Sequence, residues 1–231
     1  MTHTAAPTSL GLPFRWWDGV VAVVLWFASG FAHLFIQGSR FWYQLIAAGL
    51  VVGYLTIRRR LSRRTIFGEP LARRDAWLAV GLGLALTLFT AGVVAALRLA
   101  SGYEHPVYPD WVVFQPYIEI PITALLSSVL LAPVIEEVVF RSILYRGILR
   151  SGPVWLAAGV SALVFGLFHF LEDLGLIRAV GAVVLSLVVI GLYNRTRSLW
   201  SAIAVHATAN TALIVYGYIA ARIVGFGQTL T

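Results

Sequence analysis

The hydrophobic pattern of the chain consists of long apolar runs separated by short polar or charged segments. Seven runs come close to the roughly 20 residues that an α-helix needs to cross a bilayer. The predicted spans are residues 19–37, 41–57, 76–99, 120–149, 154–171, 175–193 and 199–221. This pattern predicts an all-α fold, a polytopic transmembrane helical bundle of seven to eight helices. The eighth would be a short helix within 101–119.

Composition supports one membrane domain. Hydrophobic residues make up 59% of the chain and charged residues only 12%, against about 25% charged in soluble domains. No segment is polar enough to cover a separate soluble core. We predict a flexible N-terminal tail over 1–14 and a single transmembrane domain over 15–231. The N-terminus lacks the pattern of a cleaved signal peptide.

The charge distribution predicts topology. The formal net charge is +7 and every basic residue is arginine; seven arginines lie between Arg58 and Arg74. The positive-inside rule places this loop in the cytoplasm. The N-terminus would then be cytoplasmic and, with seven helices, the C-terminus external, in a multi-pass protein of a prokaryotic plasma membrane. Because the arginines end apolar runs and do not form a basic face with aromatics, no nucleic-acid partner is expected.

A few ionisable or strongly polar residues interrupt the second half of the bundle. Ionisable groups at membrane depth are functional-site candidates by default. Glu137 and Arg141 are four residues apart in the favourable order, so we expect them to pair. Glu136 lies about 100° round the helix and would be available as a general base; alternatively it is a second partner of Arg141. The chain has no cysteine, which excludes disulfides, thiolate metal sites and a cysteine nucleophile.

Helix counting brings these residues to comparable depths. Glu136 precedes the turn at Gly152 by sixteen residues and His169 follows it by seventeen, so both lie about 24 Å from that turn. His206 and Asn210 are four residues apart and share a helix face. His169 could instead cap its helix, and His206 and Asn210 could serve as interhelical hydrogen-bonding residues.

Three motifs occur in order: EExxxR at 136–141, FxxxH at 165–169 and HxxxN at 206–210. With them the chain, over about 121–218, resembles the CPBP family of intramembrane proteases, which includes type II CAAX prenyl endopeptidases and bacterial Abi proteins. The resemblance implies that Glu136 and His169 activate a water for attack on a peptide carbonyl, while His206 and Asn210 bind the oxyanion. Glu137, Arg141 and Phe165 would support the site, and Phe165 and Gly166 would let the fourth span approach.

The resulting hypothesis is an intramembrane endopeptidase that cuts a peptide bond near the cytoplasmic membrane face. Its partners would be membrane lipid and a peptide or protein substrate, including one with a lipidated C-terminus. No cofactor is expected; if zinc is bound, Glu136, His169 and His206 would be its ligands, although no HExxH motif is present. A serine nucleophile lacks its usual Gly-x-Ser-x-Gly turn. The alternatives are a non-enzymatic scaffold or immunity-type protein, and a proton-coupled transporter.

Overall fold

The computed structural model describes residues 14–32, 40–59, 62–101, 122–173 and 175–228. Apart from one isolated antiparallel bridge between Gly68 and Ser198, regular structure in these ranges is helical, which confirms the all-α prediction. The tail 1–14, except Phe14, and the candidate eighth helix within 101–119, except Ser101, lie outside the described residues. The elements are α1 (Trp16–Ala32), α2 (Arg40–Arg59), α3 (Arg63–Phe67), α4 (Arg73–Ser101), α6 (Ile122–Leu126), η1 (Ser127–Leu131), α7 (Ala132–Glu137), η2 (Val138–Tyr145), α8 (Arg146–Leu149), α9 (Val154–Asp173), α10 (Leu176–Thr196) and α11 (Leu199–Gln228).

Four of these helices are long and apolar enough to cross a membrane, and they define an integral membrane protein. They span Arg73–Val94, Val154–Leu171, Leu176–Thr196 and Leu199–Ile219. Shorter apolar helices cover Trp16–Ser29 and Leu45–Ile57. The fourth predicted span is a chain of short segments, α6 to α8. The hydrophobic pattern did not predict this division, because apolar residues continue through all of these segments.

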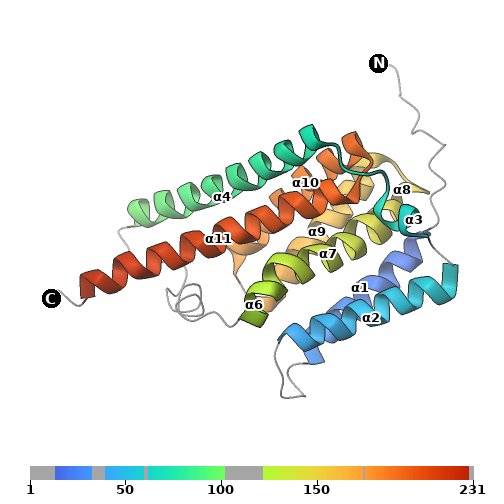
Figure 1. Ribbon diagram of the computed structural model, residues 1–231, viewed down its shortest axis with the longest axis horizontal. Coiled ribbons are helices and arrows are strands. Elements are labelled where there is room, and N and C mark those ends of the chain that lie inside the picture. The colour runs from blue at the N-terminus through green and yellow to red at the C-terminus, as the bar shows by residue number, and fades with distance from the viewer. Residues whose placement is uncertain (1–13, 33–39, 60–61, 102–121, 174, 229–231) are drawn as a thin grey trace.

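The broken α6–α8 segment lies in the middle of the bundle. Figure 1 shows α4 running alongside α11, with α1 and α2 on the opposite side of the central segment. Helix α9 packs against both α10 and η2, and α1 packs against η2. As a result, the side chains of η2 are almost entirely enclosed: every residue from Val138 to Tyr145 is buried. Chemistry placed on this segment is shielded by helices from several directions.

Two π-helical segments, η1 and η2, widen the central helix before and after the glutamates. Bonding in a π-helix runs from an N–H to the carbonyl five residues earlier. In that ladder the partner of Ser128 O is residue 133, which is a proline and has no N–H. The Asn210 side chain of α11 donates to Ser128 O instead, at 2.8 Å. Ser161 of α9 similarly donates to Phe140 O in η2 at 2.9 Å.

Glycines allow several helices to approach closely. A Cβ atom at Gly83 of α4 would lie 2.7 Å from both Val205 O and Thr208 Cβ of α11. The prediction that Gly166 allows the fourth span to approach was wrong about which helix lies next to it. Its missing side chain faces α10, where a Cβ would overlap Val183 and lie 3.0 Å from Ala179 O, and not the fourth span. Glycine at position 166 therefore allows α9 and α10 to pack closely, whereas Phe165 faces the central helix.

The contact between α4 and α11 can be tested with Gly83→Ala. The added methyl must displace backbone, so we expect the free energy of unfolding to fall by about 1–3 kcal/mol. Gly81→Ala is the matched control, because a Cβ there meets nothing within 4 Å. Reversible unfolding in mixed detergent micelles, followed by circular dichroism, measures both. Equal stability of the two variants would contradict the close approach.

Candidate active site

The buried ion pair between Glu137 and Arg141 forms the base of the site. Glu137 Oε2 lies 3.0 Å from Arg141 Nε, and both side chains are completely shielded. This confirms the pairing that their spacing predicts. The Arg141 guanidinium also lies 4.4 Å from the centre of the Phe165 ring of α9, a cation–π arrangement. A cation that would be expensive in hydrocarbon is thus neutralised by its own helix and covered by the next one.

His206 joins both glutamates from α11. Its Nδ1 lies 2.8 Å from Glu137 Oε1, and its Nε2 lies 3.7 Å from Glu136 Oε2. A carboxylate that already pairs with Arg141 acts as acceptor, so His206 Nδ1–H donates to Glu137. The assignment of Glu137 to Arg141 alone was therefore incomplete. Glu137 uses one oxygen for Arg141 and the other for His206, whose Nε2 is thereby turned towards Glu136.

The second predicted histidine, His169, is connected to this cluster through Phe165. Its Nδ1 lies 2.9 Å from Phe165 O, one turn back in α9. The Phe165 ring centre is 4.5 Å from that of His169 and 5.8 Å from that of His206. Phe165 is fully buried and also packs edge-to-face on Phe140 of η2. The phenylalanine of the FxxxH motif thus contacts both histidines and Arg141.

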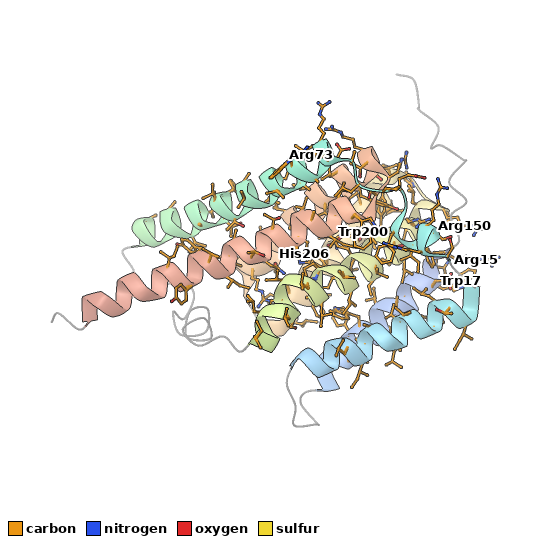
Figure 2. All side chains as sticks on the ribbon, in the orientation of Figure 1. Arg15, Trp17, Arg73, Arg150, Trp200 and His206 are labelled. Atoms are coloured by element: carbon orange, nitrogen blue, oxygen red, sulfur yellow. The ribbon has the colours of Figure 1, made fainter. Side chains whose placement is uncertain are left out.

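Asn210 lies one turn beyond His206 on α11, as its spacing predicts. The structure gives its amide a contact that the sequence analysis missed, the 2.8 Å bond to Ser128 O. A backbone carbonyl leaves no mark in the sequence. Pro133, five residues later, was the available signal, since a proline within a helix frees carbonyls of the preceding turn. Figure 2 shows His206 well inside the bundle, away from the arginine- and tryptophan-rich end.

If zinc is bound, the sequence predicts Glu136, His169 and His206 as its ligands. Among the described residues, no three histidine, cysteine, aspartate or glutamate side chains come together as a group that could hold a metal ion. The Nδ1 atoms of His169 and His206 face a backbone carbonyl and a carboxylate, and metal-ligating histidines have the same outer contacts. The individual residues suit a metal, but their arrangement does not converge on one, so no step is assigned to a metal.

These features describe a site within the membrane bundle in which His206 lies between two carboxylates, one of which pairs with the buried Arg141. Residues 118–212 match the family described as "Rce1-like: Type II CAAX prenyl endopeptidase Rce1-like". This stretch contains all three motifs, so the match supports the resemblance to the CAAX protease family that the motifs indicate. No curated protein and no solved structure gave a significant match.

The double role of Glu137 predicts a difference between the two neighbouring glutamates in stability. Glu137→Gln leaves Arg141 buried without its paired charge, so we expect a loss of about 3–5 kcal/mol in the free energy of unfolding. Glu136→Gln, the matched control, keeps that pair and should cost clearly less. Detergent-micelle unfolding monitored by circular dichroism compares them.

A second variant distinguishes the loss of the paired charge from a general disturbance of packing around residue 137. Glu137→Gln combined with Arg141→Met removes both charges, and apolar replacement of a buried pair is often close to neutral. The double variant should therefore recover most of the stability lost by the single one. Equal losses in Glu136→Gln and Glu137→Gln would contradict the assignment.

Proposed function

We propose that the chain is an intramembrane endopeptidase whose reacting groups are Glu136, His169, His206 and Asn210. The observation that carries this proposal is the buried cluster in which Glu137 orients His206 towards Glu136. The family match over residues 118–212 supports a CAAX-type peptidase in general. The roles of individual residues are inferred from chemistry and from the motifs.

Glu136 is proposed as the general base. It is 5% exposed, and its Oε2 lies opposite His206 Nε2 at 3.7 Å, a separation too long for a direct hydrogen bond. A third polar atom, such as a water oxygen or the oxygen of a substrate carbonyl, can engage both groups from beside them. In the proposed reaction Glu136, assisted by His169, removes a proton from a water molecule. The oxygen of that water attacks the peptide carbonyl carbon. When the tetrahedral intermediate collapses, the peptide C–N bond breaks and Glu136 gives the proton to the leaving amine nitrogen, which leaves a carboxylic acid and an amine as products.

His206 and Asn210 are proposed to stabilise the oxyanion. Donation of the Nδ1 hydrogen to Glu137 fixes the ring with Nε2 facing Glu136. In the proposed reaction His206 acts in its doubly protonated form, because only an imidazolium carries a second proton, at Nε2, that can be donated to the oxyanion. Asn210 uses one amide hydrogen for Ser128 O and has a second one available by its chemistry. A donor placed at a developing oxyanion is worth about 2.7–4 kcal/mol in comparable sites.

The proposed substrate is a membrane-associated polypeptide cut close to the cytoplasmic surface. His206 is seven residues into α11 from Leu199, or about 10 Å at an α-helical rise. A bond there could be reached by a C-terminal segment anchored by a lipid. CAAX-type C-terminal processing would satisfy this geometry, and the family match over residues 118–212 favours it.

Removing the proposed base separates a peptidase from the alternatives. In Glu136→Gln, cleavage of a fluorogenic prenylated peptide should fall by about 10²–10⁴-fold, the range of general-base contributions, with unfolding little changed. Thr211→Val is the control, because Thr211 is an exposed neighbour on α11 that bonds only its own helix among the contacts described, at Ala207 O. Cleavage that survives both Glu136→Gln and His169→Ala would overturn the mechanism. Proton-coupled flux without any cleavage would identify a transporter.

Metal dependence has a separate test. Because the described site residues do not converge as a ligand set, we expect peptidase activity to persist after treatment with a strong chelator and removal of the chelated metal. Elemental analysis of the same preparation provides the comparison. Stoichiometric zinc, together with activity that is lost on chelation and restored by zinc, would show that the metal-free proposal is wrong.

A further inference from the structure

The arginine-rich loop between α2 and α4, whose charge predicts a cytoplasmic location, contains a short capped helix, α3. Ser62 caps α3 by accepting a hydrogen bond from Thr65 N at 3.2 Å. Gly68 ends the helix with φ of 73°, a left-handed conformation that glycine adopts without strain. Both ends of α3 are therefore defined locally.

Side chains of the central helix hold α3 in place. Ser142 of η2 donates to Ile66 O at 2.8 Å, and Arg146 of α8 donates to Thr65 O at 2.6 Å. On the other side, Glu69 N donates to Arg197 O, in the turn before α11, at 3.1 Å. The loop is thus fixed against two parts of the bundle, and a surface built on it is preformed.

A surface pocket of about 600 Å³ lies on this docked loop. Its floor includes Phe67, whose ring stacks on Trp200 with centres 4.7 Å apart. The Arg63 guanidinium lies 5.9 Å from the centre of the Trp200 ring. Arg64 bonds Glu69 at 2.8 Å, and both of these side chains are largely exposed. The lining residues are Arg63, Arg64, Phe67, Gly68, Glu69, Pro70 and Trp200.

The residues at and around this pocket are of the types that gather in the headgroup layer of a bilayer. Trp200 lies towards the same end of the bundle as Arg15, Trp17 and Arg150, as Figure 2 shows. Tryptophan is enriched where a membrane meets water, and arginine clusters there attract anionic lipids. The pocket combines an aromatic floor with two cations against one carboxylate, so its charge favours an anion.

We propose that this pocket binds the headgroup of an anionic phospholipid from the surrounding leaflet. The lipid phosphate would lie between Arg63 and Arg64, and the glycerol region would rest against Trp200 and Phe67. The site is separate from the glutamate–histidine cluster, since none of its lining residues belongs to that cluster. It does not depend on peptidase activity.

Lipid binding can be measured directly on the purified full-length protein. Native mass spectrometry with phosphatidylglycerol or phosphatidylcholine, added separately to the detergent-solubilised protein, gives the two affinities. We expect a preference for phosphatidylglycerol that falls roughly tenfold in the double variant Arg63→Gln/Arg64→Gln, since arginines near a membrane surface each contribute to anionic-lipid attraction. The contacts from Ser142 and Arg146 reach α3 backbone atoms, so this variant should keep its thermal stability.

The matched control is Arg73→Gln/Arg74→Gln, which removes the same charge from the first turn of α4, next to the loop but outside the pocket. It should retain most of the preference. Equal losses of the preference in the two double variants would show that it depends on the overall charge of this region and not on the pocket, and would overturn the proposed site. The absence of any preference for phosphatidylglycerol in the wild type would also overturn it. Displacement of phosphatidylglycerol by inorganic phosphate at comparable concentration would overturn the lipid as the source of the phosphate.

Discussion

The cost of placing an arginine inside a membrane bundle governs the arrangement around it. Arg141 is fully buried, and Glu137 on the same helix neutralises it. This ion pair holds the Glu137 carboxylate in place, and its second oxygen then becomes a fixed acceptor for His206. Phe165 covers the guanidinium and contacts both histidines. The orientation of the proposed reacting groups therefore follows from the same contacts that make the buried cation tolerable.

The second constraint is that backbone polar groups within a membrane need partners inside the protein. The central helix breaks its regular ladder at Pro133 and across two π segments, which leaves carbonyls to be satisfied from outside. Asn210 and Ser161 supply donors from α11 and α9. Such π segments often occur at functional sites. Here they allow the residues on either side of the glutamates to be fixed by neighbouring helices.

Sequence periodicity predicted the helical class, the approximate long helices and the Glu137–Arg141 pair, because each depends on local spacing. The bridging role of Glu137 was not predictable in this way, since it depends on how α11 is rotated against α7. The bond from Asn210 to Ser128 O was missed because its acceptor belongs to the backbone. Gly166 was given the wrong neighbour, since a glycine shows that a helix is close but not which one. Helix α3 is only five residues long and has no amphipathic repeat, so it could not be distinguished from a charged loop.

The attachment of α3 to the central helix is chemically one-sided. In its two hydrogen bonds, Ser142 and Arg146 contribute side chains, whereas Thr65 and Ile66 contribute their carbonyl oxygens. Every amino acid carries such a carbonyl, so residues 65 and 66 can be exchanged without removing the acceptors, provided that the short helix still forms. For these two hydrogen bonds, the residues whose side chains are required therefore lie in the central helix. The loop can change its composition, and with it the surface that it presents, while the protein retains the same internal anchorage.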